Sequence, residues 1–275
     1  MEGDPVPRMV AGSVLVVWAL WVGVPEGAGQ ASREARPPVM KVGEELVYNV
    51  RYGFIDLGQI KIQTLKEVRG PHSVAYDGRA YIASYSSVPF VNVRAVFEST
   101  VDSGMFSRRF VGKSMEEKDH WDFSRYVFEY DRGRVLMEVG RNDSLVSKRE
   151  TLAVSTPLQD GLSLFYFARH HLLDKKRITV PVIIKEENVN AHINFGEGRE
   201  SVEIDAIGYP VDVVRFDGMA DFVGFFGLTG EFEGWFSNDD ARVPIQATLE
   251  VIIGSVTVEL MSWKREGWSP PRARE

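Results

Sequence analysis

Alternation of apolar and polar residues with a period of two constrains the fold of this chain more than any other feature. From Val42 to Ile62 such residues alternate on both sides of a turn region bounded by Gly53 and Gly58. A period of two places every second side chain on the same face of a strand. The segment therefore predicts a β-hairpin with one apolar face.

Further runs rich in β-branched and aromatic residues predict more strands. These runs are Ala80–Ser86, Val93–Asp102, Met105–Lys113, Tyr126–Tyr130, Arg134–Val139, Ile178–Ile184, Asn190–Phe195, Ser201–Ile207, Val211–Phe216, Gly230–Phe236 and Ile245–Trp263. Turn signals containing Gly, Asn or Asp separate many of them, at 131–133, 142–144, 196–198 and 208–210. Gly254 predicts a bulge, a bend or a break in the last run. We expect a mainly β fold, a large curved or partly closed antiparallel sheet that is barrel-like.

One segment departs from this pattern and predicts a single packing helix near 157–173. Thr156 suits the N-cap position and Pro157 the first helical position. Arg169 interrupts an apolar stripe that has helical spacing, made up of Leu158, Leu162, Phe165 and Leu172. We expect the helix to pack on the sheet or to plug its open side.

The N-terminus has the pattern of a secretory signal peptide. Arg8 precedes an uncharged apolar run, Met9 to Val24, and small residues follow it up to Ala31. An uncleaved membrane anchor is the alternative, although the run is shorter than the ~20 residues of a spanning helix. We therefore expect a signal peptide at 1–31, a linker at 32–40, one β-rich domain at 41–265 and a disordered tail at 266–275.

Composition excludes several classes of function. The chain has no cysteine, so it can have no disulfide, thiolate metal site, cysteine nucleophile or lipid anchor on an N-terminal cysteine. Its net charge of −7 and the absence of a long basic block argue against nucleic acid as a partner. No second segment approaches spanning length, so we expect no membrane span in the mature chain.

Five segments together resemble the DUF3108 family of bacterial exported proteins of unknown function. They are VGEELVYNVRYGFIDLGQIKI (42–62), VFESTVDSGMFSRRF (96–110), FEYDRGRV (128–135), DGLSLFYFAR (160–169) and GWFSNDDARVPIQATLEVIIGSVTVEL (234–260). The resemblance covers about residues 41–262, and the last segment is its most specific part. It implies a secreted, mainly antiparallel β domain, favours the periplasm and implies no activity.

The polar segment that follows Trp235 is a candidate turn motif. It contains Ser237, Asp239, Asp240 and Arg242. Residues of these types cap their own backbone in turns, and the arginine can pair with either aspartate. The alternative is a metal or acid/base pair made by Asp239 and Asp240, and we favour the turn.

Aromatic residues interspersed with glycines mark a second candidate, between Met219 and Phe232. Such a segment fits either a buried, sharply bent strand or an apolar loop at the mouth of a cavity. In the second case Phe222, Phe225, Phe226 and Trp235 would contact a lipid, another apolar ligand or a partner protein. We favour core packing, because most apolar clusters belong to the core, and keep the ligand contact as the alternative.

Two further patterns carry little chemistry. Ser163 with His170 or His171 lacks the Gly-x-Ser-x-Gly turn of a nucleophile and lies within the predicted helix. The acidic cluster Glu116, Glu117, Asp119, His120 and Asp122 lacks the spacing of a calcium loop, so we expect a solvated loop.

We predict an exported periplasmic β-domain protein that is not an enzyme and that binds an apolar ligand or an envelope partner. We expect no cofactor and no metal ion. The alternative is a metal-dependent or acid/base hydrolase that uses Asp239 and Asp240. No catalytic constellation in the sequence supports that alternative.

Overall fold

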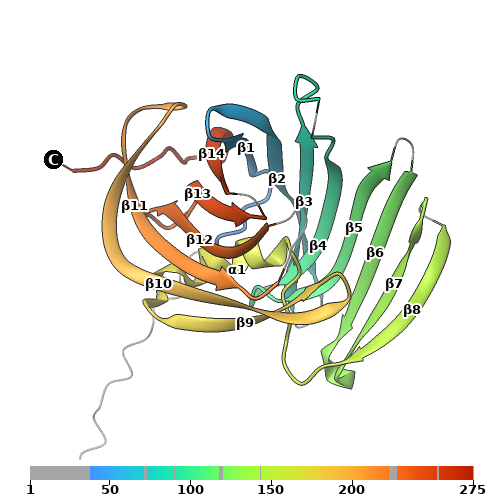
Figure 1. Cartoon of the computed structure of the whole chain (residues 1–275). Coiled ribbons are helices and arrows are strands. Elements are labelled where there is room, and N and C mark those ends of the chain that lie inside the picture. Colours follow the sequence, from blue (N-terminus) through green and yellow to red (C-terminus); the bar gives the residue numbers. More distant parts are fainter. Residues whose placement is uncertain are drawn as a thin grey trace, which may run out of the picture. The chain divides into compact units, whose positions relative to one another are not determined.

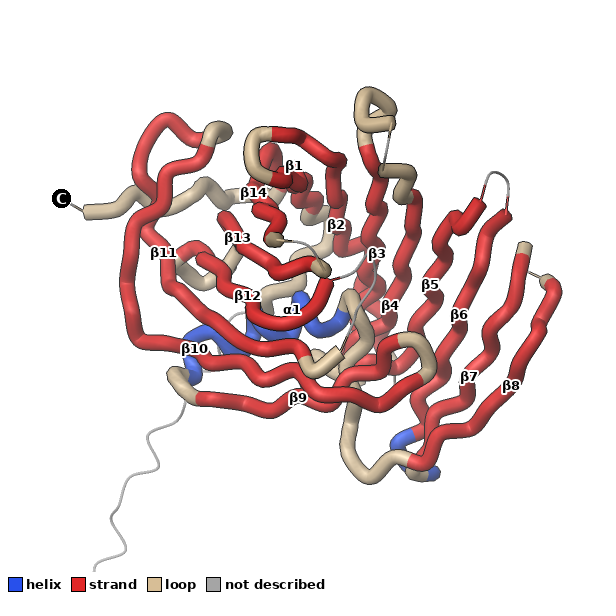
Figure 2. The backbone as a smooth tube through the Cα atoms, viewed as in Figure 1, coloured by secondary structure: helices blue, strands red, loops and turns tan. Residues whose placement is uncertain are grey.

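A computed structural model describes residues 38–70, 73–89, 91–117, 120–142, 144–222, 228–252 and 254–274, all within one compact unit. Strands make up most of the described backbone (Figure 2). They form one antiparallel sheet in the order β8-β7-β6-β5-β4-β3-β2-β1-β14-β13-β12-β11-β10-β9 (Figure 1). Their bounds are β1 Glu45–Tyr52, β2 Ile55–Arg69, β3 Val74–Ser84, β4 Arg94–Asp102, β5 Ser107–Glu117, β6 His120–Glu129, β7 Arg134–Arg141, β8 Leu145–Ala153, β9 Arg177–Ile184, β10 Glu187–Ile204, β11 Ile207–Ala220, β12 Leu228–Ser237, β13 Pro244–Val251 and β14 Ser255–Lys264.

The sheet curves back on itself without closing. Strands β8 and β9 end the strand order and do not pair with each other in the described residues. Glu186, in the turn between β9 and β10, nevertheless accepts hydrogen bonds from two residues of β6, Ser124 Oγ at 3.2 Å and Tyr126 Oη at 3.1 Å. The prediction of a large, curved, partly closed antiparallel sheet with one packing helix is confirmed.

Alternation within the strands directs one face of the sheet to the core. In β4 the side chains of Ala95, Phe97, Ser99 and Val101 are buried, and those between them are more exposed. Helix α1, Ser163–His171, packs against this face. A Cβ atom at Gly78 of β3 would lie 3.0 Å from the Tyr166 ring, so glycine permits this close approach.

Helix α1 lies within the predicted range of 157–173 but is shorter, and Thr156 is not its cap. The N–H groups of Leu162 and Ser163 both donate to the Asp160 carboxylate at 2.8 Å. Before that point, Gln159 forms an isolated parallel bridge with β9, in which its N–H donates to the Pro181 carbonyl at 2.9 Å. This extended pairing delays the start of the helix. The helix continues as a 3₁₀ turn, η2, over Leu172–Asp174.

Two predicted turns lie inside strands. Residues 196–198 belong to β10, where the pairing with β11 shifts register between Phe195 and Arg199, so the glycines there serve a bulge. Residues 208–210 belong to β11, and the chain turns earlier, at 205–206. The turns at 131–133 and at Gly254 follow the prediction. The first of them overlaps the 3₁₀ turn η1, Tyr130–Arg132.

Strand β8 has no counterpart among the predicted strands. Its sequence, LVSKRETLA, is mostly polar, and most of its side chains are exposed. An edge strand that buries neither face has no apolar alternation to detect. Its charged residues, Lys148 and Arg149 among them, suit a free sheet edge.

Both ends of the domain extend further than predicted. Val39 and Met40, which we assigned to a linker, are buried in the core. The predicted disordered tail is wrong for residues 266–274, because they pack along β11. There the Asp212 N–H donates to the Pro271 carbonyl at 2.8 Å, and the Arg272 guanidinium lies 3.9 Å from the centre of the Tyr209 ring. The tail therefore supplies partners for backbone groups of β11.

The proposed signal peptide at 1–31 lies outside the described residues. Among the residues that are described, no helix combines the length and the apolar character needed to cross a membrane.

Candidate functional site

An apolar cavity of about 370 Å³ lies between α1 and the sheet. It is lined by strands from both halves of the sheet order and by one face of the helix. Representative lining residues are Ile62, Phe97, Phe165, Ile193, Phe216 and Leu249. The alternation that directs apolar side chains inward thus builds a wall on each side, and the helix contributes a third.

Few polar groups line this cavity. The Tyr48 side chain is 3% exposed, and its hydroxyl has no hydrogen-bond partner among the described residues. Burial raises the pKa of Tyr48 well above its ordinary value, so the group stays a neutral phenol. The charged lining residues in the described part of the chain are Glu231 and Glu250. The cavity therefore offers an apolar surface and two carboxylates.

The N-terminal end of α1 is fixed to the sheet by a buried carboxylate. Asp160 is fully buried and accepts hydrogen bonds from Ser99 Oγ on β4 and Ser107 Oγ on β5, each at 2.7 Å. Together with the two N–H groups of the helix, these donors satisfy both of its oxygens. Burial nevertheless raises the pKa of Asp160. Ser163 Oγ lies 2.7 Å from Ser107 Oγ and so belongs to the same cluster.

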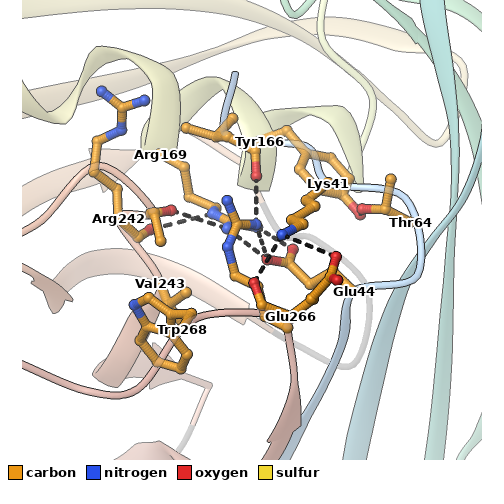
Figure 3. Close-up of polar contacts among 12 residues, drawn as sticks. Lys41, Glu44, Thr64, Tyr166, Arg169, Arg242, Val243, Glu266 and Trp268 are labelled. Carbon is orange, nitrogen blue, oxygen red and sulfur yellow. Dashed lines mark hydrogen bonds and ion pairs between the residues drawn. The ribbon is translucent and has the colours of Figure 1, made fainter. Parts of the chain in front are cut away.

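The C-terminal end of α1 is fixed by a buried ion pair (Figure 3). Arg169 donates from Nη1 and Nη2 to the two carboxylate oxygens of Glu44 at 2.7 and 3.1 Å, and both side chains are buried. Arg265 also donates to Glu44. Arg169 further donates to the carbonyls of Ala241 and Arg242 at 3.0 and 3.1 Å. This ionic cluster joins the helix, the segment before β1, the turn before β13 and the C-terminal segment.

Two opposing effects, burial and neighbouring positive charge, act on the pKa of Glu44. Burial alone would raise it, but the charges and hydrogen bonds of Arg169 and Arg265 together lower it. Nearby, burial raises the pKa of Tyr166 to about 12, and its hydroxyl lies 3.3 Å from Thr64 Oγ1. The cluster is thus a charged structural anchor beside the cavity wall, in which Glu44 is ionised and Tyr166 neutral near neutral pH.

A larger polar groove lies on the outward face of β9–β13 and has a volume of about 930 Å³. Here His192 contacts Thr179 Oγ1 through Nδ1 at 3.1 Å and Asp221 Oδ2 through Nε2 at 2.6 Å. The order hydroxyl, imidazole, carboxylate is that of a hydrolase triad. These side chains lie on an exposed sheet face, however, where cross-strand polar pairs are expected.

Comparison with known proteins identifies the family. The sequence profile described as "Protein of unknown function (DUF3108)" matches residues 47–261. The chain belongs to the DUF3108 family. Among curated proteins, no match to this DUF3108 chain was found.

Three solved structures are similar to this DUF3108 domain at low sequence identity. A β-barrel-like protein of the DUF1849 family from Brucella abortus has a TM-score of 0.50 at 13% identity, covering 80% of this chain and 96% of its own. A candidate exported protein with a YmcC-like fold from Bacteroides fragilis has a TM-score of 0.36 at 6% identity, covering 82% and 97%. A candidate lipoprotein from Parabacteroides distasonis has a TM-score of 0.34 at 10% identity, covering 82% and 96%.

The predicted aromatic contacts divide between the cavity and the outer surface. Phe222 lines the cavity. Trp235 is not one of its lining residues, and its Nε1 donates to Glu200 Oε2 at 2.7 Å. Phe225 and Phe226 lie outside the described residues.

The predicted polar motif forms a turn between β12 and β13. Asp239 Oδ1 accepts from Ser237 Oγ at 2.9 Å and from the N–H of Arg242 at 3.0 Å. Asp239 Oδ2 accepts from Trp268 Nε1 at 2.8 Å, and Asp240 is exposed. Both oxygens of Asp239 thus serve the turn and its contact with the C-terminal segment.

The remaining candidates do not assemble a catalytic or metal centre in the described residues. Ser163 bonds within the Asp160 cluster rather than to a histidine. Asp122 pairs with Arg141 at 3.2 Å on the sheet surface, and His120 begins β6. Asp119 and the side chains of Glu116 and Glu117 lie outside the described part. Where the chain is described, no three His, Asp or Glu residues are grouped to hold a metal ion.

The sequence carries a signal for the C-terminal anchor of α1. Arg169 interrupts an apolar stripe, and a charged residue on a buried face requires a buried partner. The sequence does not show which residue that is, because Glu44 lies 125 positions away.

Proposed function

We propose that this DUF3108 protein is exported to the periplasm and holds an apolar ligand in the cavity between α1 and the sheet, without catalysing a reaction on it. The cavity is the observation that carries the proposal. Its volume of about 370 Å³ falls within the range of about 300–1,000 Å³ that ligand sites occupy.

An empty apolar cavity is costly to a fold. Side chains around a void lose contacts, and the free energy of unfolding falls as the void grows, by several kcal/mol for large cavities. This chain has no disulfide to offset such a loss. A bound apolar ligand would restore the missing contacts and stabilise the folded state in proportion to its occupancy.

Export is supported by the sequence. The charge-free run from Met9 to Val24, preceded by Arg8 and followed by small residues, is the pattern of a secretory signal. An exported protein meets lipids and other apolar molecules of the envelope, which are the ligands that this cavity suits. A partner protein of the envelope is the alternative occupant of the cavity mouth.

Native mass spectrometry tests the proposal. The full gene would be expressed in an exporting host, and the mature product analysed before and after incubation with membrane extract. We expect a bound mass that organic solvent removes, and N-terminal sequencing of the same sample would show cleavage near Ala31. A product that stays free of ligand after incubation would contradict the proposal.

A matched pair of variants separates cavity binding from surface adsorption. Ala80 of β3 lines the cavity, whereas Ala83 of the same strand does not. Ala80→Phe fills the cavity and should abolish the bound mass, and Ala83→Phe should retain it. Circular dichroism would establish that both variants are folded. Retention of ligand by a folded Ala80→Phe variant would place the ligand elsewhere.

A further inference from the structure

The rim of the cavity carries two acidic side chains without a cation. Glu231 and Glu250 line both the apolar cavity and the polar groove, so they lie where the two meet. The Glu231 N–H donates to Glu250 Oε2 at 3.0 Å. Both side chains are exposed, and neither carboxylate has an ion-pair partner among the described residues.

The two arginines that line the groove do not pair with Glu231 or Glu250 in the described residues. Arg215 is bonded to Glu233 at 2.9 Å, and Arg177 lies on the edge strand β9. Neither arginine lines the cavity, whose other polar lining residues, Thr229 and Gln246 among them, are neutral. Two like charges on neighbouring strands repel each other and destabilise a sheet slightly. A cationic group bound between them would relieve that repulsion.

Tyr48 lines the same cavity, but its buried hydroxyl is not exposed to it. That hydroxyl lacks a hydrogen-bond partner in the described residues and lies near the charges of Arg169 and Glu44. Apolar walls and an acidic rim together describe a site for an amphiphile rather than for a hydrocarbon.

We propose that the cavity selects a single-chain amphiphile with a cationic head group, whose chain lies against the apolar walls and whose head lies at Glu231 and Glu250. This inference rests on the proposed function. The cavity volume, near the lower end of the range for ligand sites, suits one chain better than the several chains of a phospholipid. An anionic head of the same length would face two carboxylates without a cation to neutralise them.

Three probes of equal chain length test the selectivity: dodecylamine, dodecanol and dodecanoate. Their affinities for the mature exported protein would be measured by calorimetry at low ionic strength, each below its micelle concentration. We expect the amine to bind on the order of tenfold more tightly than the acid, with the alcohol between them. Added salt should narrow the difference, because the rim is exposed to solvent.

Variants at the rim assign the preference to these two residues. Glu231→Gln with Glu250→Gln removes both charges while keeping an oxygen that can accept the Glu231 backbone N–H, and it should reduce the amine-to-acid ratio to near unity. The control, Glu203→Gln, changes an exposed carboxylate of β10 that lines neither the cavity nor the groove, and it should leave the ratio unchanged.

The outcomes separate this inference from the proposed function. Equal affinities for amine and acid, or tighter binding of the acid, would overturn the charge selectivity while leaving the cavity as a binding site. An equal loss of preference in the Glu203→Gln control would also overturn it, because it would show attraction to the net charge of the protein. Failure of all three probes to bind would overturn both the inference and the proposed function.

Discussion

The two ends of helix α1 are held by opposite kinds of buried chemistry. At the N-terminal end, Asp160 is surrounded by neutral hydroxyls and backbone N–H groups. At the C-terminal end, Arg169 forms a bidentate ion pair with Glu44, which also receives a bond from Arg265. One anchor therefore buries a carboxylate without a cation, and the other buries charges that compensate one another. This difference predicts different costs of removal and opposite responses to pH.

Removing the cation should cause the larger loss of stability. Arg169→Met keeps most of the side-chain volume but leaves the Glu44 carboxylate buried beside a single arginine, Arg265. Breaking a buried ion pair from one side costs about 3–5 kcal/mol. We expect a decrease of that size in the free energy of unfolding, measured by urea denaturation with circular dichroism.

The control for this variant is an exposed ion pair. Lys148 lies 2.9 Å from Glu150, with both side chains about half exposed. Lys148→Met should cost less than about 1 kcal/mol. A loss for Arg169→Met no larger than that of the control would show that the buried pair does not stabilise the helix position.

Removing the N-terminal anchor should cost less. Asp160→Ala deletes the cap of α1 and leaves two buried serine hydroxyls, Ser99 and Ser107, to find other partners. A lost cap costs about 0.5–2 kcal/mol and an unsatisfied buried group about 1–3 kcal/mol. Partial rearrangement of the hydroxyls leads us to expect a total of about 2–3 kcal/mol in urea denaturation. Asp160→Asn, which keeps an accepting oxygen, should recover part of this loss, and failure to do so would show that the charge itself is required.

The sequence could predict the features that depend on contacts between residues close together in the chain. The strands followed from period-two alternation, and the helix followed from its stripe and from the polar residues near its start. Those signals come from residues close together in the chain, so they can be recognised from the sequence alone. Strand β8 gave no signal, because an exposed edge strand has no buried face to mark.

The anchors and the cavity depend on long-range pairing instead. Asp160 meets Ser99 and Ser107 across 61 and 53 positions, and Arg169 meets Glu44 across 125. The register between strands that are distant in the sequence determines which of these residues come into contact. No local sequence pattern encodes that register. Phe222 was predicted as a ligand contact from the glycines beside it, and the structure places it on the cavity wall. Glu231 and Glu250 were not predicted, since an exposed glutamate in a strand is ordinary.

The stability that each anchor contributes should also depend on pH in opposite ways. The folded pKa of Glu44 is below its ordinary value of 4.5, so its contribution to stability is present above pH 4.5 and is lost as pH falls through the folded value. The folded pKa of Asp160 is above its ordinary value of 3.8, so its stabilising contribution is present below pH 3.8 and is lost as pH rises through the folded value.

Urea denaturation across this pH range should therefore separate the anchors. The stability advantage of the wild type over Glu44→Gln should shrink as pH falls below 4.5. Relative to Asp160→Asn, the wild type should gain stability as pH falls towards 3.8. Each difference can change by at most about 1.4 kcal/mol per pH unit, because one proton is involved. Parallel profiles for the two variants would contradict the opposite assignments.

The smallest effects are expected at two tyrosines near the C-terminal anchor. The Tyr166 hydroxyl has a partner in Thr64 Oγ1, so Tyr166→Phe should cost about 0.5–1.5 kcal/mol. The Tyr48 hydroxyl has none among the described residues, so Tyr48→Phe should be neutral or slightly stabilising in the ligand-free protein. A clear loss of stability in ligand-free Tyr48→Phe would instead make that hydroxyl part of the anchor.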